Sequence, residues 1–74
     1  MGNEYERALI FFNRKIIVHV VKEDGTFYNG LILEISKEFF VIQDRVMGEQ
    51  YVLFAELKRQ IEPYRVEEEG DGRD

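Results

Sequence analysis

The sequence lacks cysteine and tryptophan, and it contains one proline and one histidine among its 74 residues. Without cysteine, neither a disulfide framework nor a thiolate metal site can form. His19 would need carboxylate partners to bind a metal ion, and no acidic residue stands at a recognisable spacing from it. We therefore expect a protein without a metal ion or any other cofactor, in which His19 is a packing or rim residue.

Long apolar runs are also absent. The longest are ALIFF at 8–12 and IIVHVV at 16–21, and polar residues separate the two. A membrane-spanning helix needs about 20 apolar residues. A secretory signal needs a basic start, whereas this chain begins with Glu4 and Glu6. We expect a cytoplasmic protein that does not enter a membrane.

Candidate catalytic groups are scarce. Outside tyrosine, the hydroxyl groups belong to Thr26 and Ser36, and neither has a base placed for it in the sequence. Glu34 and Glu38 resemble an acid/base pair, but such pairs arise by coincidence in an acid-rich chain, and a domain this small offers little room for a substrate pocket. We expect no enzymatic activity and no small-molecule substrate.

Negative charge is concentrated at the C-terminus. The chain carries a net charge of −5, and residues 67–74 (EEEGDGRD) contain five acids and one arginine, which leaves residues 1–66 nearly neutral. This segment has no apolar residue, so we expect a disordered acidic tail. Such a tail is either solvated or a docking segment for a basic partner.

Apolar and aromatic residues, in contrast, are plentiful at 45% and 14% of the chain. The length allows one small domain, which we place at residues 1–66. A core of this size gives marginal stability, and disulfides are excluded. Association with other copies or with a partner is the remaining means of stabilisation.

The apolar spacing changes from helical to strand-like along the chain. Asn3 and Glu6 can form a capping box for a helix at about 3–13, in which Tyr5, Leu9 and Phe12 share one face. Asp-Gly at 24–25 predicts a hairpin turn, and Gly30 inside the next strand predicts a bend or a close backbone approach. The strands are expected at about 15–22, 26–35, 38–44, 49–54 and 60–65, with one helical turn at 55–58.

This pattern predicts a mainly β fold: a short N-terminal α-helix followed by five strands that form a bent, SH3-like barrel. In the third strand, Phe39 and Val41 should face one side and Phe40 and Ile42 the other. Pro63 restricts the fifth strand to an edge or a strand end. Other β-barrels and sandwiches with this number of strands stay open as alternatives.

Two segments resemble the Sm-like family, which includes the LSm and Hfq-type proteins. IIVHVVKEDGTFYNGLILEIS (16–36) is similar to the family's first motif, and GEQYVLFAELKRQIEPYR (48–65) to its second, so that the resemblance covers about residues 3–65. It implies an Sm-type barrel, homo-oligomers joined through the fourth and fifth strands, with a ring as one arrangement, and binding of single-stranded RNA.

The nucleotide pocket of the family is altered in this chain. Ser36 stands where the family usually carries aspartate, Phe40 stands near the place of its asparagine, and Phe54-Ala55 replaces an Arg-Gly or Lys-His pair. The groups that read uridine are therefore absent. The resemblance then implies RNA binding that is weak or not specific for uridine.

The candidate RNA-binding residues are Ser36, Phe40, Arg45, Phe54, Lys58 and Arg59. The aromatic residues Phe39, Phe40, Tyr51 and Phe54 would either stack on unpaired bases or fill the core. The basic residues, which include Arg14, Lys15 and Arg65, would either follow a phosphate backbone or belong to a solvated, mixed-charge surface. The expected oligomer interface consists of Tyr51, Leu53, Ile61 and Tyr64.

Two functions follow. In the first, the protein is a non-catalytic homo-oligomer associated with RNA. In the second, it is a protein-interaction or structural scaffold module that has lost the nucleotide pocket.

Overall fold

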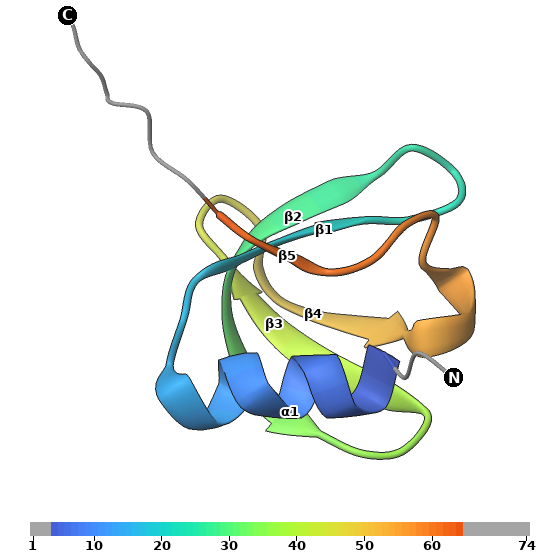
Figure 1. Ribbon diagram of the computed structural model, residues 1–74. Coiled ribbons are helices and arrows are strands. Elements are labelled where there is room, and N and C mark those ends of the chain that lie inside the picture. Colours follow the sequence, from blue (N-terminus) through green and yellow to red (C-terminus); the bar gives the residue numbers. More distant parts are fainter. Residues whose placement is uncertain (1–3, 65–74) are drawn as a thin grey trace, which may run out of the picture.

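The computed structural model describes residues 4–64. Helix α1 (Glu4–Arg14) comes first, and it is followed by β1 (Val18–Val21), β2 (Phe27–Ile35), β3 (Phe39–Asp44), β4 (Gly48–Leu53), the 3-10 turn η1 (Phe54–Glu56) and β5 (Glu62–Pro63) (Figure 1). The expected acidic tail at 67–74 lies outside the described residues.

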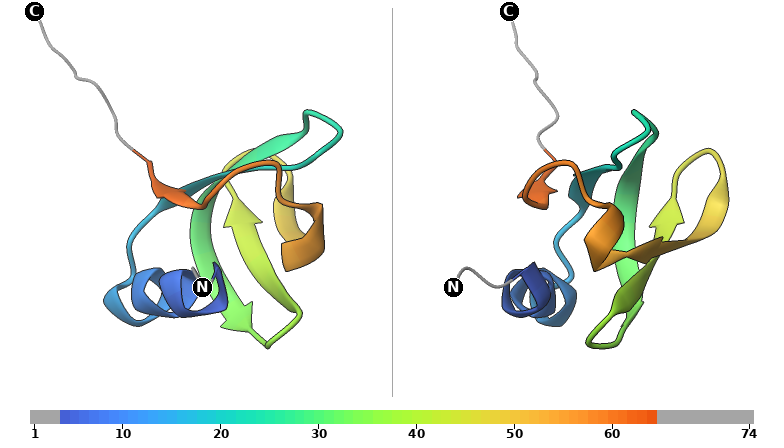
Figure 2. Two further views of the ribbon diagram at one scale, coloured as in Figure 1. Left: turned by 45° about the vertical axis from the view of Figure 1, so that its right-hand side comes forward. Right: turned by 90° about the vertical axis from the view of Figure 1, so that its right-hand side faces the viewer.

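The strands form one antiparallel sheet in the order β4-β3-β2-β1-β5. The predicted mainly β fold, with a helix before five antiparallel strands, is confirmed in the described residues. The predicted barrel closure is not: β4 and β5 are the two edges of an open, strongly curved sheet, and they do not pair within residues 4–64 (Figure 2). The physical reason lies in β5, because a strand of two residues that contains a proline provides little hydrogen-bonding capacity.

Helix α1 packs on its own sheet. Ala8 and Phe11 are its buried residues, and they join the core cluster beside β2. The helix ends in a Schellman arrangement: the Ile16 N–H donates to Phe11 O at 3.0 Å and the Lys15 N–H donates to Phe12 O at 3.2 Å, with Lys15 at φ 55°. Residues 15–17 therefore close the helix, and β1 begins three residues later than predicted.

Strand β2 curves because its backbone approaches β3 closely at Gly30. A Cβ atom at this position would lie 1.7 Å from the carbonyl oxygen of Gln43. The register between β2 and β3 then shifts between Ile32 and Glu34, which adds local twist. The predicted role of Gly30 in a close approach is confirmed.

The concave side of the sheet, together with α1, encloses the core. The alternation predicted for β3 is confirmed, since Phe40 and Ile42 are fully buried whereas Phe39 and Val41 are half-buried on the opposite face. The core consists of Ala8, Phe11, Val18, Val20, Tyr28, Ile32, Phe40, Ile42, Val52 and Ile61.

The segment between β4 and β5 follows β1 before β5 begins. The Glu23 N–H donates to Glu56 O, and the Lys58 N–H donates to Val21 O at 2.9 Å. The helical turn lies at 54–56 instead of 55–58, and the fifth strand is shorter than the predicted 60–65. Residues 58–60 are exposed and lie outside any regular element.

Candidate functional site

Phe40 and Phe54, the two aromatic residues of the candidate RNA-binding set, lie in the core and against it. Phe40 is fully buried, so its ring has no exposed face in the described structure. Phe54 is half-buried and packs against the Phe40 ring at 5.2 Å and against the Tyr5 ring at 6.4 Å. Ser36 lies at the β2–β3 turn, where its N–H donates to Phe39 O at 2.8 Å. Of the two readings of the Phe40 and Phe54 rings, packing is the one that this geometry supports.

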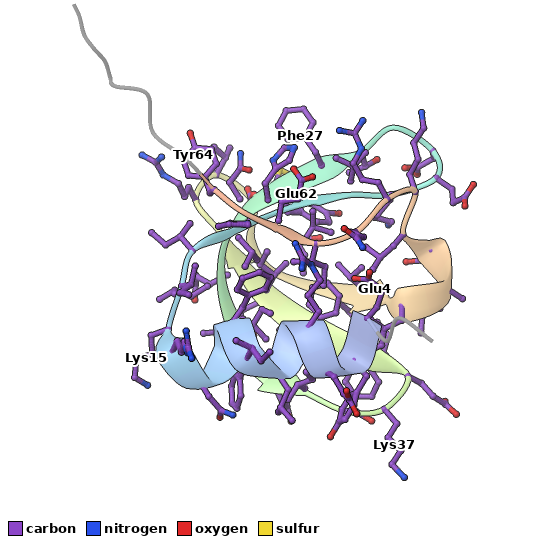
Figure 3. All side chains as sticks on the ribbon, viewed as in Figure 1. Glu4, Lys15, Phe27, Lys37, Glu62 and Tyr64 are labelled. Atoms are coloured by element: carbon purple, nitrogen blue, oxygen red, sulfur yellow. The ribbon has the colours of Figure 1, made fainter. Side chains whose placement is uncertain are left out.

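The predicted basic residues come from separate elements. Arg45 belongs to the β3–β4 turn, where its N–H donates to Asn29 O on β2. Lys58 and Arg59 belong to the segment that joins η1 to β5, on the other side of β1. Lys15 lies at the C-terminal end of α1, at the opposite end of the helix from Glu4 (Figure 3). These positions do not form a continuous basic strip along one element.

The predicted interface residues divide into two pairs. Tyr51 is 59% exposed and Leu53 is 36% exposed, and both lie on β4. Ile61, in contrast, is fully buried in the core, and Tyr64 is half-buried with its N–H bonded to Ile17 O at 2.8 Å. A charged replacement of Ile61 would thus disrupt core packing before it reached any neighbour.

The convex side of the sheet carries an apolar patch, which we call the outer face. Its apolar residues are Leu31, Leu33, Phe39, Val41, Tyr51 and Leu53, contributed by β2, β3 and β4, and the register places Glu34 opposite Val41 and Gln43 opposite Leu31 on the same face. The Phe39 and Tyr51 rings stack with centroids 4.5 Å apart and an interplanar angle of 18°. Its contiguous apolar part is formed by Phe39, Val41, Tyr51 and Leu53, which are paired across β3 and β4. An exposed apolar cluster on a small protein commonly marks an interaction surface.

Strand β4 also has an open backbone edge. The Phe54 N–H donates to Glu38 O at 3.0 Å, and Val52 lies opposite Phe40 in the register of the two strands. In an antiparallel pair, every second residue directs its N–H and C=O toward the neighbouring strand. In β4 the residues that face β3 in this way are Gly48, Gln50 and Val52. The N–H and C=O groups of Glu49, Tyr51 and Leu53 consequently point away from the sheet. We call these three residues the β4 edge. Among them, both groups of Leu53 are engaged: its N–H donates to Glu56 Oε1 at 3.3 Å, and as the N-cap of η1 its C=O takes part in that 3-10 turn.

Beside the opposite edge, at β5, two side chains of α1 contact the backbone of Ile61. The Ile61 N–H donates to Glu4 Oε1 at 3.2 Å, and Arg7 Nε donates to Ile61 O at 2.5 Å. Two side chains of one helix thus occupy both outward backbone groups of the residue before β5. Pro63 is the next residue whose backbone points away from β1, and as a proline it has no N–H to donate. We call this contact the α1 clamp.

The β3–β4 turn is organised by Asp44. Its carboxylate accepts hydrogen bonds from the N–H groups of Asn29, Val46 and Met47 at 2.8, 2.9 and 2.8 Å. These backbone bonds, with that from Met47 the largest contribution, hold the pKa of Asp44 below its ordinary value.

The side chains of Val46 and Met47, in contrast, point outward and are 87% and 64% exposed. They border a shallow hollow of about 460 Å³ whose other lining residues are Phe27, Asn29, Asp44 and Arg45.

Asp44→Asn is expected to lower the thermal midpoint at neutral pH, because it removes the charge that three N–H donors stabilise. A carboxylate with a lowered folded-state pKa contributes stability above its unfolded pKa, and this stability is lost as the pH falls through the folded pKa. The difference in midpoint between wild type and variant should therefore shrink below about pH 4. Thermal melts at pH 7 and at about pH 2.5 measure it, with Glu34→Gln as an exposed control. A difference that is unchanged between the two pH values would contradict this role.

His19 is held by a neighbouring amide. Its Nδ1 lies 2.5 Å from Asn29 Oδ1, and its ring is 5.9 Å from that of Phe27. Within residues 4–64, no three His, Asp or Glu side chains are grouped in a way that would hold a metal ion.

Sequence patterns gave no indication of several of these features. Glu4 and Arg7 stand three residues apart on α1, a spacing that any helix surface can show, and their shared partner is a backbone 54 or more residues away. The outward direction of the β4 backbone follows from pairing with β3, which the sequence does not specify. For Asp44, the signal was present: an aspartate before a turn that ends at Gly48 is typical of a side chain that accepts backbone N–H groups.

In the part of the chain that the structure describes, no helix combines the length and the apolar content that a membrane crossing requires. No protein-family model matches the chain, and no curated protein shows significant similarity to it.

Proposed function

We propose that this chain is a non-catalytic interaction module that associates through the β4 edge and the adjoining outer face. The observation that carries this proposal is the open β4 edge, which lies beside the exposed side chains of Tyr51 and Leu53. An edge strand with unpaired backbone groups is a template for another strand, and natural proteins usually protect such edges. The expected partner is a second copy of the chain or a strand of another protein.

We propose further that the architecture is of the Sm type. A helix before five antiparallel strands, a long curved second strand with a glycine at its bend and a 3-10 turn before the fifth strand support this assignment. In that architecture, the resemblance of the sequence implies a ring joined through the fourth and fifth strands. For the location of the protein we propose the cytoplasm, as expected from the absence of long apolar runs in the sequence.

RNA association is the second candidate, and the stacked Phe39 and Tyr51 rings favour it. Aromatic rings on the open face of a sheet can stack on unpaired bases, with about 1 to 3 kcal/mol per base in proteins that bind this way. The flanking Glu34, Glu38 and Glu49 are exposed and would repel phosphate groups. For this reason we place RNA binding behind protein association.

Two measurements on the full chain separate the candidates. We expect light scattering to give a mass above that of the monomer, and fluorescence anisotropy with labelled U-rich, A-rich and mixed RNAs to show no saturable binding at low salt. Saturable binding that weakens with salt and disappears in Phe39→Ala would instead establish the outer face as an RNA surface. A monomer that binds none of the RNAs would contradict both self-association and RNA binding and leave a strand of another protein as the partner.

A further inference from the structure

We infer that two copies of this chain pair β4 with β4 in antiparallel orientation about a two-fold axis at Tyr51, which joins their sheets into one continuous sheet. The inference rests on the proposed association through the β4 edge, and it specifies the partner and the register. Identical edges that meet in this way form a closed, isologous dimer.

The hydrogen-bonding geometry of the β4 edge fits such a pairing. The outward backbone groups belong to Glu49, Tyr51 and Leu53, which are spaced at the two-residue period of a strand. With the axis at Tyr51, each Tyr51 exchanges two backbone hydrogen bonds with its counterpart. Each Glu49 lies opposite Leu53 of the other copy, whose carbonyl is the one that opens the 3-10 turn η1. The two Tyr51 hydrogen bonds form in this register while the bond between the Leu53 N–H and Glu56 and the 3-10 turn η1 are kept.

The β5 edge is a poorer partner for β4. The α1 clamp occupies the N–H and the C=O of Ile61, through Glu4 and Arg7 respectively. Pro63 has no N–H, so its carbonyl is the outward group that β5 itself can offer. Pairing of β4 with β5 of a neighbour would require release of both clamp contacts, whereas pairing of β4 with β4 requires no rearrangement of α1.

The side chains of the β4 edge also suit a two-fold arrangement. Tyr51 of one copy lies beside Tyr51 of the other, so that the two Phe39–Tyr51 stacks join across the axis. Glu49 is the charged residue of β4. In this register the two Glu49 positions are four residues apart, about 14 Å along the strand, which exceeds the screening length at physiological salt. The pairing therefore brings apolar surfaces together without placing like charges opposite each other.

The absence of cysteine makes a direct test available. Tyr51→Cys places one thiol on each side of the proposed axis, at the Cα separation of about 5.5 Å that a disulfide accepts. Under mild oxidation we expect a disulfide-linked dimer at a yield about ten-fold or more above that of Glu34→Cys, an exposed control on β2 at equal protein concentration. Circular dichroism checks that both variants are folded.

A second pair of variants covers the case in which Tyr51→Cys does not fold. Glu49→Cys and Leu53→Cys, mixed in equal amounts, should cross-link to each other more than either does to itself, because the register places these positions opposite one another.

Light scattering of the wild-type chain distinguishes the failures of the two proposals. A dimer mass together with the Tyr51→Cys cross-link supports the inference. A larger mass without this cross-link would overturn the β4–β4 pairing and leave association through β4 and β5 of neighbouring copies. A monomer mass at every concentration would overturn the inference and remove support for the proposed self-association as well.

Discussion

Phe40→Ala is expected to destabilise the domain by about 3 to 5 kcal/mol, because it empties the centre of the core. Phe40 is fully buried and contacts the ring of Phe54, and its backbone pairs with both Ile35 and Val52. A single core of this size rarely provides more than about 3 to 5 kcal/mol of total stability. The variant should therefore be largely unfolded at room temperature, which urea titration followed by circular dichroism will show.

Phe39→Ala is the matched control, since it is the same substitution one residue earlier. Phe39 lies half-buried on the outer face and stacks on Tyr51. We expect a loss of about 1 kcal/mol from the missing ring contact. Equal losses at the two positions would mean that the strand does not present its residues to the core and the outer face as described.

Gly30→Ala is expected to cost about 3 kcal/mol or more, because the new methyl group would collide with backbone atoms. The added Cβ would lie 1.7 Å from Gln43 O and 2.6 Å from Gln43 C, and neither atom belongs to a flexible side chain. The β2–β3 pair would have to separate at this point to accept it. The midpoint of urea unfolding should fall accordingly, with loss of strand content in circular dichroism if the pair opens fully.

Gly25→Ala provides the comparison for Gly30→Ala. Gly25 lies in the β1–β2 turn at φ 90°, and a Cβ there would meet no atom within 4 Å. Its expected cost is the backbone strain of a left-handed conformation, about 1 to 2 kcal/mol. If Gly30→Ala proved no more destabilising than Gly25→Ala, the close approach of β2 to β3 would not exist in solution.

The central part of the fold was predictable because local and long-range signals agree there. Residues 25–44 combine a turn at Gly25, a glycine at the bend and a continuous apolar run around Phe40, and the structure places β2 and β3 within one residue of the predicted bounds. The two-residue period of a strand predicts that Phe40 and Ile42 share one face and that Phe39 and Val41 share the other, but it does not specify which face is buried.

Closure of the sheet was not predictable for a physical reason that the segment at 60–65 illustrates. Its sequence allows a strand, but the Lys58 N–H already donates to Val21 O on β1. Pro63 in addition lacks the N–H that a longer row of hydrogen bonds to another strand would need. Whether a short strand pairs with one neighbour or two depends on the three-dimensional path of the preceding segment. Sequence periodicity carries no information about that path.

The candidate site was predicted in part. Tyr51 and Leu53 were selected from their strand positions and are exposed on β4, whereas Phe40 and Ile61, selected from the resemblance and from strand position, are in the core. An aromatic or β-branched residue has the same sequence signature in both environments. Their separation requires knowledge of which face α1 covers.

The two edges of the sheet differ in how they are protected. At β5, a proline, a short strand length and the α1 clamp all limit further pairing. At β4, the protection consists of one charged residue, Glu49, and of the Glu56 contact to the Leu53 N–H. Proteins protect edges to prevent unwanted pairing. This asymmetry is the reason for proposing the β4 edge, and not the β5 edge, as the one that takes a partner.

Amide hydrogen exchange at Tyr51, measured by NMR at low and high protein concentration, tests the central claim most directly. The account predicts that the outward N–H of Tyr51 exchanges rapidly in dilute solution and becomes protected at least about ten-fold as copies associate. The N–H groups of Gln50 and Val52, which face β3, are internal controls that should be protected under both conditions. A Tyr51 amide whose exchange rate does not change with concentration, in a solution where the mass shows association, would contradict the β4 edge as the site of assembly.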